Sequence, residues 1–228
     1  MNKTYYTAVG HFQHRTDGQG HSYPVILVNQ EESIVDVQEM AVWTILNWRF
    51  LRYEQIEAKY EQLSRDLPQS QRMLETCLNR LEVRGLIARG TGETDFEALY
   101  DLLGELYVAP LSESLPLRLL TFGKLLLEGV PFSKAKQLFQ KGRPNDQEAR
   151  VMALSRQALL STAELIKCAE VGATDVSTDE KLMEVLIDND YTSSDSIAFE
   201  MLQAEQRVPV TIAVANLYLR KQIIFERV

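Results

Sequence analysis

Four residues that could contact DNA bases recur at helical spacing between positions 72 and 83. At about 100° per residue, Arg72, Thr76, Asn79 and Val83 would lie on one face of a helix. Arginine can pair with guanine, asparagine with adenine, and a threonine methyl can contact the thymine methyl. This spacing therefore predicts a helix able to read the DNA major groove.

The other side of this segment has the pattern of a buried helix face. Apolar residues recur at i, i+3, i+4 and i+7, namely Leu74, Cys77, Leu78 and Leu81. The pattern predicts a helix over 71–84 that begins after a capping Ser70. Gly85 is placed to end it in the left-handed region, and a short strand over 86–89 follows.

Additional arginines near this helix could contact phosphates. Residues 65–89 hold five arginines and three acidic residues. The candidate DNA-binding set is therefore Arg65, Arg72, Thr76, Asn79, Arg80, Val83, Arg84 and Arg89. The alternative interpretation is an ordinary solvated face, because exposed helices commonly carry arginine, asparagine and threonine.

Charge gives limited support to nucleic-acid binding. The chain has 228 residues and a net charge of −8. Residues 36–92 hold eight basic and eight acidic residues, whereas residues 93–228 hold 14 basic and 21 acidic ones. Strong nonspecific nucleic-acid binders usually have a basic domain, and this chain has none.

The residues typical of catalysis and metal binding do not form a recognisable motif. His11 and His14 are three apart on an expected strand, so they would point to opposite faces. The sequence lacks HExxH, CxxC, GxSxG and GxxxxGK[ST]. We therefore expect no enzymatic activity, cofactor or metal. Cys77 and Cys168 fall in helical patterns and are expected to be buried reduced thiols in a cytoplasmic protein. No signal peptide or membrane span is expected.

The elements that would position this helix precede it in the sequence. Residues 5–14 and 23–28 predict a hairpin, with glycines in the turn. Asp36 and Glu39 form a capping box for a helix, and a second helix is expected from about Tyr53 to Ser64 before Pro68.

The rest of the chain reads as mainly helical. Helices are expected over 96–107 with Asp95 as cap, 117–129, 133–142, and after the capping pairs Asn145–Glu148 and Ser161–Glu164. Three more patterns start at 177, 192 and 211, and a strand follows at 223–228. Residues 211–216 also fit a buried strand. As a helix, 211–222 would be apolar most of the way round, as in a core or a dimer seam.

The predicted fold is mainly α with a small β component. Residues 1–92 would form a hairpin and a winged-helix-like unit, and residues 93–228 a helical domain for dimerisation or partner binding. Because NLYLRKQIIFER resembles NRLEVRGLIARG in outline, a second winged-helix-like unit over 177–228 is an open alternative.

The three helices and RGLIARG over 36–92 resemble the winged helix-turn-helix class of bacterial transcription regulators. The resemblance implies that helix 71–84 is the recognition helix. One departure is that GTGETDFEALY leads into a helix, so a return strand of the wing is short or missing.

Residues 5–90 also resemble the small peptide-chaperone domains of pyrroloquinoline quinone and related peptide-maturation pathways. The similar segments are VILVN, VDVQEMAVWTIL and LNRLEVRGLI. This resemblance implies binding of a peptide by strand addition. Two functions follow as hypotheses: a DNA-binding regulator acting as a homodimer, or a peptide- or protein-docking module that uses the hairpin edge and helix 71–84.

Overall fold

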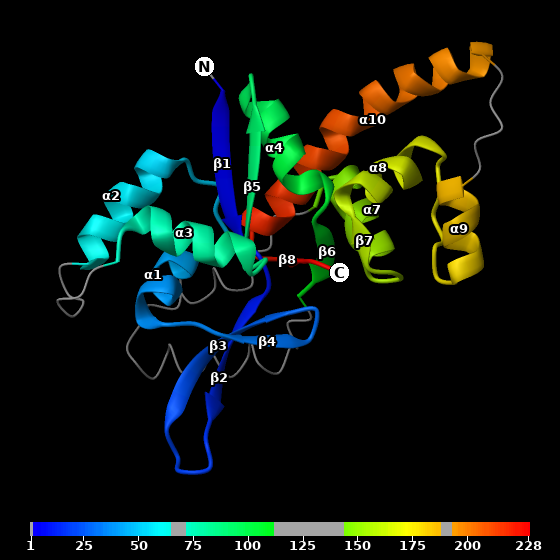
Figure 1. Cartoon of the computed structure of the whole chain (residues 1–228). Coiled ribbons are helices and arrows are strands. Elements are labelled where there is room, and N and C mark those ends of the chain that lie inside the picture. The colour runs from blue at the N-terminus through cyan, green and yellow to red at the C-terminus, as the bar shows by residue number, and fades with distance from the viewer. Residues whose placement is uncertain (1, 65–71, 112–143, 188–192) are drawn as a thin grey trace, which may run out of the picture.

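The computed structural model describes residues 2–64, 72–111, 144–187 and 193–228. It consists of helices with small antiparallel sheets, as the sequence predicts in outline. In Figure 1, helices α1–α3 lie on one side and α7–α9 on the other, with β1, β5 and α4 between them, and α10 runs from the middle to the upper right above α7–α9.

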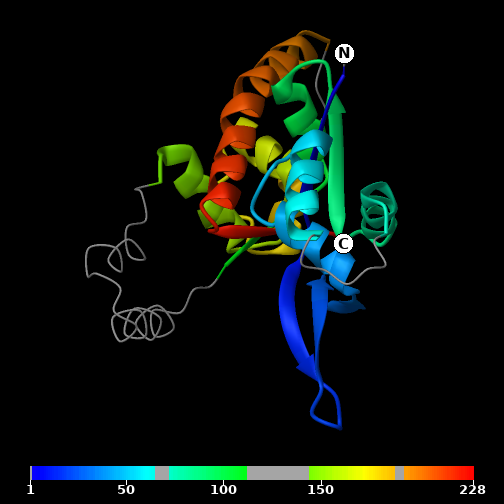
Figure 2. The same cartoon turned by 90° about the vertical axis from the view of Figure 1, so that its left-hand side faces the viewer.

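The N-terminal segment forms the predicted hairpin and one additional strand. The strands are β1 (Lys3–Ala8), β2 (His11–Thr16), β3 (Ser22–Val28) and β4 (Glu31–Ile34). The order β2-β3-β4 makes one antiparallel sheet, which projects from the body in Figure 2. The predicted strand 5–14 is divided at Gly10, where φ is 81° and a Cβ atom would lie 2.2 Å from the carbonyl oxygen of Leu27. The division frees β1 to pair elsewhere.

Three helices follow the hairpin: α1 (Val37–Leu46), α2 (Tyr53–Ser64) and α3 (Leu74–Val83). The capping box of Asp36 and Glu39 is confirmed. The prediction that α3 begins at 71 is wrong, because its N-cap is Met73, which supplies no side-chain cap. The expected Ser70 cap and Pro68 lie outside the described residues. The buried face of α3 is the one that its periodicity predicts.

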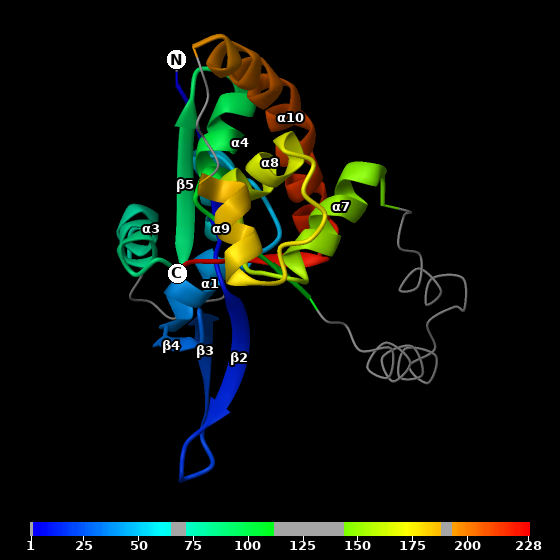
Figure 3. The ribbon, with the colours of Figure 1, turned by 90° about the vertical axis from the view of Figure 1, so that its right-hand side faces the viewer.

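Strand β5 (Ile87–Gly92) pairs with β1 in antiparallel register. The strand beside β5 is therefore β1, in the place of a return strand after the turn. Helix α4 (Asp95–Gly104) turns back onto this sheet. Its N-cap is Thr94, not the predicted Asp95, because Thr94 forms a capping box with Glu97. Figure 3 shows α3 and α4 on opposite sides of β5.

Besides helices, the C-terminal part contains a three-stranded antiparallel sheet, of which the sequence predicted only the last strand, at 223–228. Its elements are β6 (Tyr107–Pro110), α7 (Asp146–Ser155), β7 (Leu160–Ser161), α8 (Thr162–Glu170), α9 (Asp179–Ile187), α10 (Ser193–Leu219) and β8 (Ile223–Glu226). The capping boxes at Asn145 and Ser161 are confirmed. The helices expected over 117–129 and 133–142 lie outside the described residues. Residues 211–216 are helical, within the single helix α10.

The two halves of the described chain share a pattern of strand pairing, although β2–β4 of the first half and one helix of the second half have no counterpart among the described residues. In the first half, Tyr6 of β1 pairs on one side with Leu51, in an isolated bridge, and on the other side with Arg89 of β5. In the second half, β6 lies in the same way between β7 and β8. The last fifty residues do not form this unit by themselves, because β8 pairs with β6, which begins at Tyr107.

The spacing inside the two halves also corresponds. Helices α1 and α7 have ten residues each, and their strand bridges, at Leu51 and Leu160, both begin five residues after the helix ends. Helices α3 and α10 end one residue before an arginine. That arginine precedes a residue of positive φ: Gly85 at 70° in the first half and Lys221 at 57° in the second.

In each half, a buried carboxylate holds the end of the helix that precedes the last strand, α3 in the first half and α10 in the second. Glu39 and Glu148 occupy the N3 position of α1 and α7, and each is 1% exposed. Glu39 accepts a hydrogen bond from Arg84 at 3.1 Å, and Glu148 accepts one from Arg220 at 2.8 Å. Each glutamate therefore links the start of one helix to the end of another.

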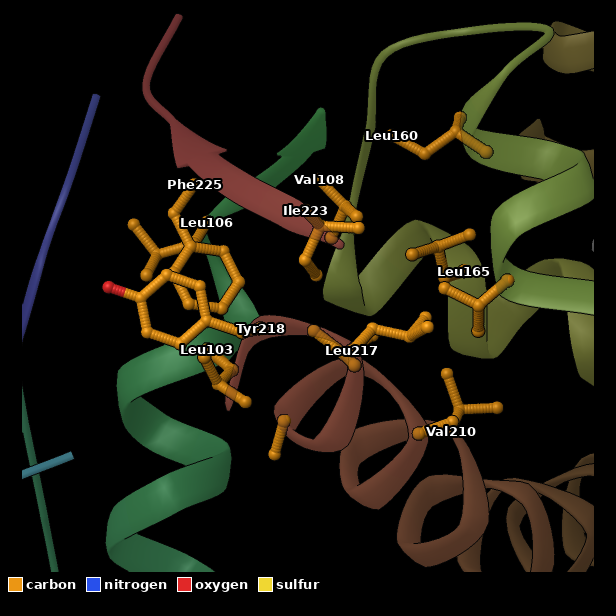
Figure 4. Packing of buried hydrophobic residues seen from close by; sticks show 14 of the residues in the cluster. Leu103, Leu106, Val108, Leu160, Leu165, Val210, Leu217, Tyr218, Ile223 and Phe225 are labelled. Carbon is orange, nitrogen blue, oxygen red and sulfur yellow. The ribbon is translucent and has the colours of Figure 1, made fainter. Parts of the chain in front are cut away.

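The hydroxyl of Tyr218 joins the two halves. It accepts hydrogen bonds from the backbone N–H of Trp48 and the hydroxyl of Thr7, both at 2.9 Å, and donates one to the carbonyl of Ala8 at 3.2 Å. Figure 4 shows its ring packed in a hydrophobic core beside Leu103, Leu106 and Phe225.

We expect Tyr218→Phe to lower the free energy of unfolding by about 1–3 kcal/mol, because the N–H of Trp48 loses its buried acceptor. The measurement is urea denaturation. Tyr100→Phe is the matched control, since the Tyr100 ring stacks against Arg207 and phenylalanine keeps that ring. An equal change in both variants would contradict the assigned role of the hydroxyl.

We expect Gly90→Ala to destabilise the protein more strongly than a typical glycine substitution, because a Cβ atom would lie 2.2 Å from the backbone nitrogen of Leu102. Overpacking of this kind costs about 1–3 kcal/mol. In Gly104→Ala a Cβ atom meets nothing within 4 Å, so this control should be neutral or stabilising. Thermal melts of both variants test the expectation, which fails if Gly90→Ala melts with the wild type.

Candidate functional site

The arginines of the predicted recognition helix contact carboxylates of this chain. Glu39 accepts hydrogen bonds from Arg80 at 2.6 Å and Arg84 at 3.1 Å, and lies 3.8 Å from Arg72. Arg72 also forms an ion pair with Asp36. The buried charge of Glu39 is therefore stabilised by guanidinium groups at its surface-facing side, as a buried carboxylate requires.

The other members of the predicted DNA-binding set are dispersed. Arg89 forms an ion pair with Glu82 at 3.1 Å, and Arg65 lies outside the described residues. Thr76, Asn79 and Val83 are exposed on α3, as predicted. Thr76 and Asn79 line a pocket.

That pocket lies between α3 and the face of the β1–β5 sheet that is turned away from α4. Its volume is about 540 Å³, and it is lined by Tyr6, Tyr53, Glu75, Thr76, Leu78, Asn79, Glu82 and Arg89. A second pocket, of about 400 Å³, is lined by Tyr53, Glu57, Tyr60, Glu61, Arg72, Met73, Leu74 and Glu75. The two share Tyr53 and Glu75, so they adjoin. We call this continuous depression the α3 groove.

The α3 groove is acidic and partly aromatic. It contains four carboxylates and two guanidiniums, and each guanidinium already contacts a carboxylate. Burial raises the pKa of Tyr53, and the negative charges of Glu57 and Glu75 raise it further. The groove would therefore attract a positively charged ligand and repel a polyanion.

Among the described residues, no group of three or more acidic, histidine or cysteine side chains could hold a metal ion. Cys77 and Cys168 are free and buried, as predicted. Burial raises the pKa of Cys168 to about 11, which keeps the thiol protonated and poorly nucleophilic. The expectation of no enzymatic activity stays a prediction.

Within the described part of the chain, no helix has the length and apolar character needed to cross a membrane. Comparison with protein-family models, curated proteins and solved structures returns no match for this chain. The two resemblances noted in the sequence therefore stay predictions.

Sequence reasoning missed most of the α3 groove. Tyr6 comes from β1 and Tyr53 from α2. The place of Tyr6 beside α3 depends on its strand pairing with Arg89, more than eighty residues along the chain. Glu82 lies on α3 itself, but its significance depends on Arg89, which only the turn after the helix brings within 3.1 Å. The only sequence signal for this part of the groove was the group of aromatic residues near the N-terminus. Such residues are equally typical of a hydrophobic core and of a binding surface.

We expect Glu39→Gln to reduce the free energy of unfolding by about 3 kcal/mol, the lower end for breaking a buried ion pair, because its guanidinium partners are partly exposed. Glu180→Gln, on the exposed surface of α9, serves as the control and should be neutral. Chemical denaturation at pH 7 provides the comparison. A loss no larger than in the control would show that Glu39 does not orient α3.

Proposed function

We propose that this chain is a tandem of two winged-helix-like units, and that the α3 groove of the first unit docks a positively charged segment of a partner protein. The proposal involves no chemistry at the groove. The observation that carries it is the charge of the groove: four carboxylates line it, and its two arginines are engaged by carboxylates of the chain.

The same observation argues against DNA as the ligand of α3. Phosphate contacts supply most of the nonspecific affinity of DNA-binding proteins, and they require available cations. Arg72, Arg80 and Arg84 hold Asp36 and Glu39. Releasing them would leave a buried carboxylate unpaired, which is strongly unfavourable.

The shape of the groove fits a peptide or a protein loop. Its two pockets together extend along α3 from Met73 to Glu82. The tyrosines offer apolar ring faces and polar hydroxyls, a combination common at protein interfaces. A ligand that carries lysine or arginine beside an apolar residue satisfies both features.

Selection from a displayed library of random 12-residue peptides tests the proposal. Peptides selected on the wild-type protein should be enriched in lysine and arginine. A synthetic copy of a selected peptide should bind about tenfold more weakly to Glu57→Gln/Glu75→Gln, since each partly exposed charge pair contributes up to about 1 kcal/mol. Fluorescence polarisation measures the affinity, which should also fall as salt is added.

The matched control is Glu180→Gln/Glu184→Gln, which removes two exposed carboxylates from α9. It should bind the peptide like the wild type. Equal weakening of both double variants would mean that only the net charge matters. Salt-dependent binding of a labelled random-sequence DNA duplex that Asn79→Ala weakens would instead support the DNA-binding hypothesis and overturn the proposal.

A further inference from the structure

The surface of the second unit that corresponds to the α3 groove is already covered by a segment of the first unit. The ring of Phe50 lies 5.3 Å from that of Tyr218 and 6.4 Å from that of Phe225, between centroids. Trp48 donates a hydrogen bond from its indole N–H to the carbonyl of Ile223 at 3.3 Å. The covering segment is therefore Trp48-Arg49-Phe50.

Residue positions in the two units establish the correspondence. Tyr218 lies two residues before the arginine that follows α10, as Glu82 lies two residues before the arginine that follows α3. Phe225 is the third residue of β8, as Arg89 is of β5. Tyr218 and Phe225 stack with centroids 4.3 Å apart, whereas Glu82 and Arg89 form an ion pair at 3.1 Å and line the groove.

The strand registers support the same correspondence independently. Arg89 pairs with Tyr6, which also bridges to Leu51. Phe225 pairs with Val108, which also pairs with Leu160 and therefore takes the place of Tyr6. The two faces thus have equivalent backbones and different side chains: an apolar pair that is covered, and a charged pair that is open.

We infer that the ligand of the α3 groove carries an aromatic residue next to an arginine or lysine, in the manner of Trp48-Arg49-Phe50. This inference rests on the proposed docking function and specifies its ligand. The aromatic ring would stack on the guanidinium of Arg89, at the position where Phe50 meets Phe225. The neighbouring cation would pair with Glu75 or Glu82, which face the same pocket.

The backbone of the covering segment is also informative. Trp48 has a φ of 56°, a left-handed conformation that costs energy in a residue with a side chain. In the folded chain, the hydrogen bond from the Trp48 N–H to Tyr218 and the position of Lys221 over the indole ring hold it. A free peptide must adopt a similar turn when it binds, so a partner that presents the motif in a preformed loop should bind more tightly.

The probe is the fluorescein-labelled peptide Asn-Trp-Arg-Phe-Leu-Arg, which copies residues 47–52, with Asn-Ala-Arg-Ala-Leu-Arg as its matched control. Fluorescence polarisation with the full chain should show about five- to thirtyfold tighter binding of the aromatic peptide, the ratio that two stacked rings would give at about 0.5–1 kcal/mol each. Arg89→Ala should weaken this preference, and Glu75→Gln should weaken the binding of both peptides, because they share their arginines.

Both variants change exposed residues, so they test the site without threatening the fold. Unchanged binding in both Arg89→Ala and Glu75→Gln would show that the peptide binds elsewhere, including on the second unit, and would overturn the inference. Equal binding of the two peptides would also overturn it.

The failure of this inference differs from failure of the proposed function. If library selection yields lysine- and arginine-rich peptides without aromatic residues, and these require Glu57 and Glu75, the docking function stands and the aromatic motif is wrong. If neither selected peptides nor the Asn-Trp-Arg-Phe-Leu-Arg peptide bind in the α3 groove, both proposals fail.

Discussion

A buried carboxylate at the third position of a helix is the interaction on which both units depend. Glu39 caps its own helix, neutralises guanidiniums of α3, and is 1% exposed. An unpaired charge there would be very unfavourable, so α3 can only lie where its arginines reach Glu39. Glu148 and Arg220 repeat the arrangement in the second unit. The constraint orients α3 and α10, and in α3 it engages the charges that a DNA-reading helix would need.

The two units differ in the surface formed by their last helix and last strand. The second unit has the apolar residues Tyr218 and Phe225 on its α10 and β8 face, and Trp48 and Phe50 of the first unit cover this face. The equivalent face of the first unit is polar and hollowed. One unit therefore uses this surface for internal cohesion, and the other leaves it accessible to a ligand.

Local signals in the sequence predicted much of the fold. Capping boxes at Asp36, Asn145 and Ser161 and the apolar stripe of α3 depend on residues within one or two turns, so the sequence displays them directly. The start of α3 and the cap of α4 were wrong by one to three residues. Thr94 and Asp95 compete for the cap of α4, and α3 begins after Met73, which provides no side-chain cap. The sheet of the C-terminal part was less visible, since β6 and β7 are short and β6 meets β8 only through a pairing that spans more than one hundred residues.

The sequence by itself determined the buried face of α3, the capping boxes at Asp36, Asn145 and Ser161, the hairpin and the exposure of Thr76, Asn79 and Val83. These features follow from short-range periodicity and local hydrogen bonding. Only the tertiary structure decided whether the arginines are available. Glu39 is separated from Arg80 by 41 positions, and no local pattern relates them. Burial of that glutamate turns a face that resembles a DNA-reading surface into a set of internal ion pairs, beside a groove whose remaining charge is acidic.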